Sequence, residues 1–123
     1  MILVDTSIWI DHLHTNQPEL VALLDADEAG CHRYVIEELG LGSINQRGVV
    51  LELLGNLYQF PVLDHAEVMT LINARRLWGL GLSAMDCHLL GAVSLIGGAR
   101  IWTRDNRLIA ACRDTGVAYL DES

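Results

Sequence analysis

Four acidic residues, far apart along the chain, each lie beside a short apolar run and together could perform metal-dependent chemistry. They are Asp5 after Ile2-Leu3-Val4, Glu38 after Val35-Ile36, Asp86 ahead of a long helical pattern, and Asp105 after Ile101-Trp102-Thr103. In an open α/β sheet, ligands bind just beyond the carboxyl ends of the strands. Carboxylates gathered there repel one another unless a positive charge joins them. Because the chain contains no lysine, the simplest such charge is a hard divalent cation.

Small hydroxyl side chains accompany three of these acids: Thr6 and Ser7, Ser83, and Thr103. Hydroxyls beside carboxylates suit a hydrated Mg²⁺ or Mn²⁺, which one or two carboxylates hold together with water and substrate phosphate. Softer metals call for histidine or cysteine ligands, and His88, two residues after Asp86, points elsewhere on its helix. The other histidines, which lack ligand spacing and are expected to be surface or hydrogen-bonded residues, are His12, His14, His32 and His65.

Each acid also has an ordinary structural explanation. Asp5 could be the N-cap of a helix, and Ser83 with Asp86 resembles a capping box. Thr103 could cap the last helix, with Asp105 in its first turn complementing the helix dipole. Glu38 could be a solvated helix residue. These explanations are adequate for each acid alone, but three of the four acids lie at helix N-termini directly after apolar segments, which favours a shared site.

Glu37 and Glu38 compete for one place in such a site. A helix advances about 100° per residue, so Val35, Ile36 and Leu39 define its buried face. Glu38 lies at the margin of this face, whereas Glu37 points towards solvent. A residue at the margin can reach a cleft, so we expect Glu38 to contribute.

The elements that must position these acids alternate between short apolar strands and helices, which implies crossover connections and a parallel sheet. The expected strands are 2–5, 60–63, 100–102 and 117–120. The expected helices are 7–14, 18–29, 34–42, 50–57, 68–78, 83–96 and 104–114. The high helix content predicts a small parallel sheet flanked by helices on both faces, an α/β/α sandwich, formed as a single domain by residues 1–123.

Composition limits the class of protein. The net charge is −8 and the sequence pI about 4.8, the wrong sign for a protein that binds nucleic acid through a basic surface. A hydrophobic share of 51% suggests that some apolar surface is covered by a partner. No apolar run is long enough to span a membrane. Three cysteines without CxxC spacing favour buried thiols and a cytoplasmic location.

Four motifs in this order resemble the PIN-domain family, and in particular the VapC-type toxins of toxin–antitoxin modules. The motifs are Asp5-Thr6-Ser7 after an N-terminal strand, Val35-Ile36-Glu37-Glu38-Leu39 followed by Leu41-Gly42, Met85-Asp86 opening a helix, and Trp102-Thr103-Arg104-Asp105. The resemblance covers essentially the whole chain. One departure is Glu37, where related sequences often carry a small residue.

The resemblance implies a metal-dependent endoribonuclease with the acids as its catalytic quartet. Asp5 and Asp86 would bind Mg²⁺, or Mn²⁺, directly, and Glu38 and Asp105 would hold metal-bound waters or a second ion. Ser7 and Thr103 would be supporting polar residues. The resemblance also implies an RNA substrate and inhibition by a cognate antitoxin protein.

Arginines and tryptophans are further candidates for contact with RNA. Arg104 and Arg107 could bind substrate phosphates, although solvated surface residues are the commoner case. Trp9, Trp78 and Trp102 could stack on bases, but we expect burial in a core or interface.

The apolar surplus suggests a homodimer, through helices at 49–57 or 68–78, and an antitoxin groove near the N-terminal helices.

Three other classes of protein fit parts of the pattern. A phosphoacceptor signalling domain relies on a lysine beside its aspartate, which this chain lacks. A haloacid-dehalogenase-type phosphatase needs the same lysine and an Asp-x-Asp motif, where Asp5-Thr6-Ser7 stands. A catalytically silent PIN-like binding module stays open, although the complete acidic quartet argues against it.

Overall fold

The centre of the molecule is a four-stranded parallel sheet. The computed structural model describes residues 1–122. Its strands are β1 (Ile2–Val4), β2 (Ala29–Cys31), β3 (Tyr58–Gln59) and β4 (Arg100–Trp102). The strand order is β3-β2-β1-β4, and every neighbouring pair is parallel. The expectation of a small parallel sheet is confirmed.

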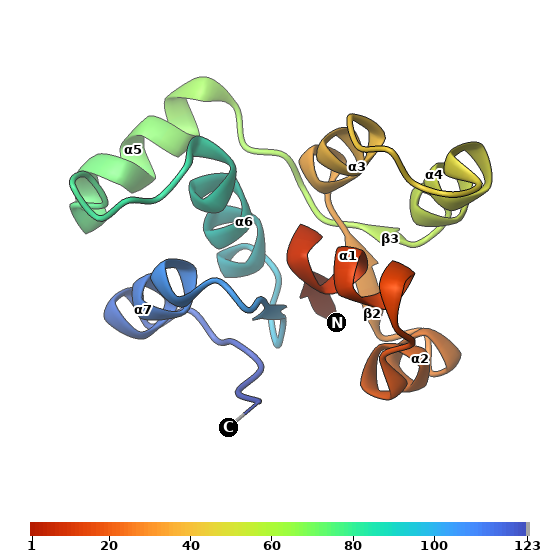
Figure 1. Cartoon of the computed structure of the whole chain (residues 1–123). Coiled ribbons are helices and arrows are strands. Elements are labelled where there is room, and N and C mark those ends of the chain that lie inside the picture. Colours follow the sequence, from red (N-terminus) through yellow and green to blue (C-terminus); the bar gives the residue numbers. More distant parts are fainter. Residues whose placement is uncertain (123) are drawn as a thin grey trace.

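Seven helices connect and surround the strands in the described part of the chain (Figure 1). They are α1 (Thr6–His14), α2 (Pro18–Asp25), α3 (Arg33–Gly40), α4 (Arg47–Gly55), α5 (His65–Arg75), α6 (Ala84–Ser94) and α7 (Asn106–Thr115). Helix α3 packs against α4, and α5 packs against α6. Figure 1 shows these two pairs on opposite sides of the strands, with α2 and α7 on the lower right and lower left. None of the helices in residues 1–122 has the length and apolar character that a bilayer crossing requires.

Side-chain caps explain where several helices begin. Asp64 and Glu67 form a capping box at the start of α5, and Ser83 and Asp86 form another at α6. Each box satisfies two backbone N–H groups that a helix start would otherwise leave unpaired. Asp105, rather than Thr103, is the N-cap of α7, so the expected position of this cap was two residues too early.

The hydrophobic core lies on the sheet and under the helices around it. Strand β1 is buried along its whole length, as expected for a central parallel strand. The three cysteines are buried, which confirms the expectation of buried thiols. Gly91 of α6 packs against Leu63 and Leu71: a methyl group on it would lie 2.5 Å from Cδ2 of Leu63 and 3.2 Å from Cδ2 of Leu71, so these side chains would have to shift.

Several of the expected elements differ from the structure. Strand β2 was missed, because Ala29-Gly30-Cys31 is small and has no strand pattern; helix α2 ends at Asp25 instead of continuing to residue 29. The strand expected at 60–63 is wrong: β3 is Tyr58–Gln59, and pairing ends where Pro61 lacks an N–H group. The strand expected at 117–120 is reduced to one bridge, between Ile101 and Tyr119.

Candidate active site

Asp5 is the central and most buried acid of the candidate site. It follows β1 directly and is the N-cap of α1, with 7% of its surface exposed. Its Oδ1 accepts a hydrogen bond from the Thr6 N–H at 2.8 Å, and its Oδ2 accepts one from the Thr103 hydroxyl at 2.7 Å. Burial raises the pKa of Asp5, the two hydrogen bonds oppose this rise, and the charges of Asp86 and Asp105 add to it. Three acids therefore share one electrostatic environment.

The segment after β4 brings Asp105 to this environment. Strand β4 pairs with β1 so that Trp102 lies opposite Val4, and the Asp5 N–H donates to the Trp102 carbonyl. Thr103 is buried and links the two segments, because its hydroxyl donates to Asp5 and accepts from the Asp105 N–H at 3.1 Å. Residues at the ends of two adjacent strands thus meet at one edge of the sheet.

Asp86 reaches the site from the first turn of α6. Its Oδ2 accepts from the Ser83 N–H at 3.0 Å, while the Ser83 hydroxyl accepts from the Asp86 N–H. The capping explanation is therefore correct for Asp86, as it is for Asp5, and both residues still face the site. Capping and site membership are compatible, because a carboxylate has lone pairs for both.

Glu38 lies on the face of α3 that is directed at the other acids. Its pKa is raised by burial and by the charges of Asp5 and Asp86. Both glutamates are exposed, but Glu38 lines the same pocket as these two acids and Glu37 does not. The helix geometry therefore places Glu38 with the quartet.

The four carboxylates line one open pocket of about 440 Å³. Its remaining lining residues are Thr6, Ser7, Ile10, Gly81, Ser83 and Met85. The hydroxyls of Thr6 and Ser7 are buried and have no hydrogen-bond partner in the described residues. Unpaired buried oxygens beside repelling carboxylates are the donor set that a hard, hydrated cation satisfies.

The residues fit such a cation only with water as a co-ligand. Within residues 1–122, no three histidine, cysteine, aspartate or glutamate side chains are arranged to enclose an ion. One or two carboxylates with several waters is the usual environment of Mg²⁺. The pocket therefore suits Mg²⁺ or Mn²⁺ better than a metal that needs a closed set of protein ligands.

Arg104 and Arg107, both candidates for phosphate contact, have different environments. The Arg104 guanidinium donates to Asp11 at 2.5 Å, to Gln17 at 2.9 Å and to Glu122 at 3.1 Å. Glu122 also accepts from the indole of Trp102. Arg104 therefore links α1 to the C-terminal segment, and each of its three side-chain nitrogens donates to a protein acceptor.

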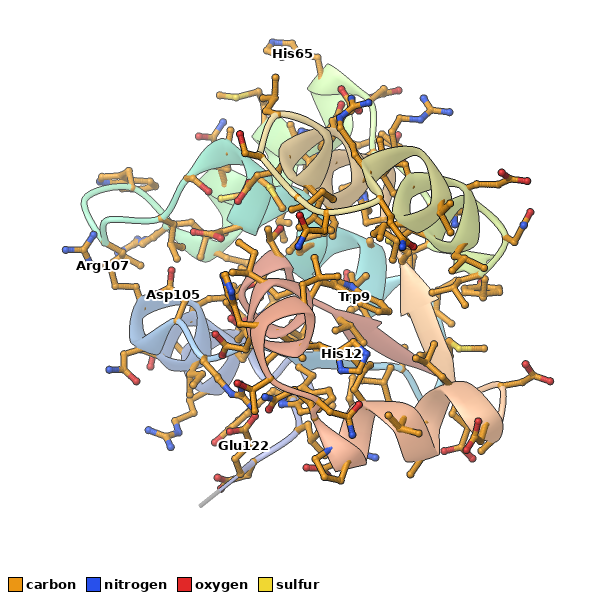
Figure 2. All side chains as sticks on the ribbon, turned by 45° about the vertical axis from the view of Figure 1, so that its right-hand side comes forward. Trp9, His12, His65, Asp105, Arg107 and Glu122 are labelled. Carbon is orange, nitrogen blue, oxygen red and sulfur yellow. The ribbon has the colours of Figure 1, made fainter. Side chains whose placement is uncertain are left out.

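Arg107 lies instead across the α5–α6 connection at the rim of the pocket. A methyl group on Gly81, which lines the pocket, would lie 3.0 Å from Cδ and 3.1 Å from Nε of Arg107. Gly81 also has a φ of +77°, a conformation that favours glycine. Figure 2 shows Arg107 projecting beyond Asp105 on the same side of the molecule. Gly81 is not among the site residues expected from the sequence; the glycines at both 79 and 81 were the available signal.

A model of the PIN domain matches residues 2–114 of the chain. The match covers most of the sequence and all four acids. The chain belongs to the PIN-domain family. Ribonuclease VapC32 from two strains of Mycobacterium tuberculosis, CDC 1551 / Oshkosh and ATCC 25618 / H37Rv, is 65% identical over 122 residues, which are 99% of this chain and 98% of each relative.

Solved structures agree with this PIN fold. FitAcB from Neisseria gonorrhoeae superposes with a TM-score of 0.64 at 22% identity, over 98% of this chain and 97% of that one. PAE2754 from Pyrobaculum aerophilum gives a TM-score of 0.61 at 19% identity, over 89% and 83%. FitAB bound to an IR36 DNA fragment gives 0.61 at 20% identity, over 98% and 94%. At these identities the likeness establishes the fold.

His32 of this PIN domain is a buried histidine. It was expected at the surface or hydrogen-bonded, and it is completely buried; an interaction with the Pro61 backbone partly opposes the fall in its pKa. Its Nδ1 accepts from the Tyr34 N–H at 3.0 Å and so caps α3, the helix that carries Glu38. Burial, with the charge of His88, lowers the pKa of His32 to about 4.

We expect His32 to make the domain less stable in mild acid. The folded state holds the ring neutral, while the unfolded chain takes up a proton near pH 6.5. The free energy of unfolding should therefore fall as the pH drops from 6.5 to 4, by about 3 kcal/mol from this residue. Urea unfolding of His32→Asn should show a flatter dependence over that range. His65→Asn, at an exposed position, should retain the wild-type slope; equal slopes for all three proteins would contradict the assignment.

Proposed function

We propose that this PIN-domain protein is a metal-dependent endoribonuclease that acts as the toxin of a type II toxin–antitoxin module. The observation that carries the proposal is the meeting of four remote carboxylates in one pocket. The 65% identity to Ribonuclease VapC32 over nearly the full length supports the ribonuclease activity. The active unit in this proposal is one domain, residues 1–123, in the cytoplasm.

The roles of the residues follow from their environments. Asp5 and Asp86 would hold Mg²⁺, or Mn²⁺. When bound, such an ion supplies an activated water and offsets the charge of the phosphate. Glu38, with its raised pKa, would accept the proton of the attacking water, and Asp105 would orient waters or help to hold a second ion. Thr103 would keep Asp5 in place through its hydrogen bond, and the unpaired Ser7 hydroxyl would be a further oxygen ligand for bound water.

Substrate phosphates would be bound by Arg107 rather than Arg104. Arg107 is exposed at the rim of the pocket beside Gly81, whereas the guanidinium of Arg104 is held by Asp11, Gln17 and Glu122. An arginine with free donors can bind phosphate in a bidentate manner. This position also offers a positive charge in a chain of net charge −8.

Removal of metal tests the proposal directly. Purified protein incubated with total cellular RNA and Mg²⁺ should produce discrete cleavage products, which can be mapped by primer extension. Excess EDTA should abolish cleavage, and fresh Mg²⁺ should restore it. Asp114→Asn, which removes one exposed acid of α7, should behave like the wild type. Absence of cleavage, together with calorimetry showing no Mg²⁺ or Mn²⁺ binding, would instead support a catalytically silent binding module.

An apolar groove between α1, α2 and α4 is the proposed binding site of the antitoxin. Its volume is about 300 Å³, and it is lined by Trp9, His12, Leu13, Leu24, Val50, Leu53, Leu54 and Leu57. Figure 2 shows Trp9 and His12 on the side of α1 that faces α2 and α4. Leu53 is 62% exposed. Exposed apolar side chains that line a groove together mark a surface that binds a partner. An amphipathic segment of a partner would cover these side chains.

A charge placed in this groove should release the antitoxin. A small partner purified with the tagged chain from native cells is identified and then added to purified variants during RNA cleavage. Leu53→Glu should need at least about tenfold more partner for half-inhibition, because a buried unpaired carboxylate costs well over 1.4 kcal/mol. Val49→Glu, on the same helix but outside the groove lining, should be inhibited like the wild type. Equal inhibition of both variants would contradict this site.

A homodimer stays a prediction. With α4 assigned to the antitoxin, the remaining candidate is the shallow depression between α5 and α6, which includes Leu63, Leu71 and Leu95. Light scattering that shows a monomer at high concentration would contradict it.

A further inference from the structure

The connection between α5 and α6, residues 76–83, carries an exposed tryptophan and also contributes residues to the acidic pocket. Gly81 and Ser83 of this connection line the pocket. Trp78 is 61% exposed, whereas Trp9 and Trp102 are 6% and 1% exposed. The expected burial is therefore confirmed for those two and wrong for Trp78. A large indole left in solvent is costly in free energy, and such residues are enriched at binding surfaces.

Unpaired arginines lie at both sides of this connection. Arg75 and Arg76 precede Trp78 at the end of α5, and Arg107 lies across Gly81. All three are exposed, and none of them takes part in the ion pairs found within residues 1–122, which involve Arg104. The chain is strongly acidic, yet these three arginines have no carboxylate partner in the described residues. Two of them lie near an exposed aromatic side chain in the sequence, and the third lies against the same connection. Such a surface suits a ligand with negative charges for the arginines and flat apolar faces for the indole. A nucleic acid strand has both features.

We propose that Trp78 stacks on an unpaired base of the RNA next to the cleaved phosphodiester, while Arg107 contacts a phosphate of the same strand. The proposal rests on the proposed ribonuclease function and adds a substrate-positioning residue, Trp78, whose stacking needs an unpaired base. Bases inside a duplex are stacked on one another and cannot offer a face to a side chain. Trp78 is thus a substrate-positioning residue on the connection that also contributes Gly81 and Ser83 to the pocket.

A second copy of the chain fits this surface less well. A twofold-symmetric contact places the same patch on both subunits, so Arg75, Arg76 and Arg107 would face their own copies. Like charges brought together in an interface oppose association.

The fluorescence of Trp78 provides a direct test, because Trp9 and Trp102 are buried. The probe is a 12-nucleotide RNA that spans a cleavage site mapped in total RNA, added to the non-cleaving Asp86→Asn protein. The single strand should quench the emission, and the same strand annealed to its complement should not. In the Asp86→Asn, Trp78→Ala protein, the Kd for the single strand should rise about 5- to 100-fold, and Trp78→Phe should restore most of the affinity. Leu80→Ala, an exposed apolar residue of the same connection, should bind like the parent.

In the cleaving protein, with no Asp86 substitution, Trp78→Ala should affect substrate binding and leave the chemical step almost unchanged. Trp78→Ala should raise KM for this RNA by a similar factor and change kcat by less than about threefold, because stacking binds substrate and transition state equally. An unquenched emission at saturating RNA, or an unchanged Kd in Trp78→Ala, overturns the proposal while the ribonuclease function stands. Light scattering in which Trp78→Ala turns a dimer into a monomer, with RNA affinity unchanged, also overturns it. If the wild type cleaves no RNA at all, the proposed function itself fails.

Discussion

Replacing Asp5 with asparagine should abolish RNA cleavage and at the same time make the folded domain more stable. Asp5 accepts hydrogen bonds from Thr6 and Thr103 and shares its environment with Asp86 and Asp105. An asparagine can retain the Thr6 contact through its amide oxygen, but it lacks the charge that holds a cation. We expect cleavage to fall by about 1,000-fold, which corresponds to roughly 4 kcal/mol of activation free energy.

The gain in stability follows from the pKa of Asp5, which burial raises above the ordinary value. An acid with a raised pKa stabilises the folded state when protonated, at low pH; this contribution is lost as the pH rises through the raised pKa. At pH 7 the ionised, buried Asp5 is therefore destabilising. Asp5→Asn should raise the Tm by roughly 3–5 °C, as about 1 kcal/mol does in a domain of this size.

Metal addition separates this effect from a general change in packing. Excess Mg²⁺ should raise the Tm of the wild type by mass action. At a concentration of 100 times the Kd, binding adds about 2.7 kcal/mol to the free energy of unfolding. The same excess of Mg²⁺ should leave the Tm of Asp5→Asn almost unchanged. Asp114→Asn is the matched control, since it removes an acid outside the pocket, and it should respond to Mg²⁺ like the wild type. RNA cleavage retained by Asp5→Asn would remove the nuclease mechanism altogether.

Substitution of two adjacent glutamates should give opposite results. Glu38→Gln should lower kcat by about 100-fold, the lower end of what a positioned general base contributes. Glu37→Gln should lower it by less than about twofold. The two changes are chemically identical and one residue apart on α3, so effects on helix stability should be similar. Only Glu38 lines the pocket, and only its pKa is raised by Asp5 and Asp86.

The pH dependence of cleavage is a second measurement that should distinguish Glu38 from Glu37. The burial and neighbouring charges that raise the pKa of Glu38 should place the acidic limb of the rate profile above the ordinary pKa of a glutamate. Glu38→Gln should remove this limb, because the amide does not titrate, and Glu37→Gln should leave it in place. If Glu37→Gln were the damaging variant, α3 would have to be turned so that Glu37, rather than Glu38, faces the pocket.

Local sequence signals predicted most of the framework that positions the site. The apolar run Ile2–Val4 and the capping pattern Ser83–Asp86 each produced the expected element, because buried strands and capped helices depend on neighbouring residues. Strand β2 has no such signal: Ala29-Gly30-Cys31 is a strand only because it pairs with β1 on one side and β3 on the other. Residues 117–120 lack this support and form only a single bridge.

The set of candidate acids came from residue types at the ends of apolar segments, and one pocket contains all four. Sequence reasoning could not separate Arg104 from Arg107, because both follow β4 and both are exposed candidates by type. Their difference lies in partners distant in the chain: Asp11, Gln17 and Glu122 hold the first, and Gly81 lies against the second.

The amino-acid order alone predicted the parallel α/β class and several helix starts, because strand and cap patterns are visible over a few residues. It also nominated the four acids that line the pocket. Folding in three dimensions settled which charged and aromatic side chains are free. Arg104 is consumed by long-range pairing, while Trp78 stays in solvent although its type favours burial. Availability of a side chain depends on neighbours that are remote in sequence, and these are set by how the helices pack around the sheet.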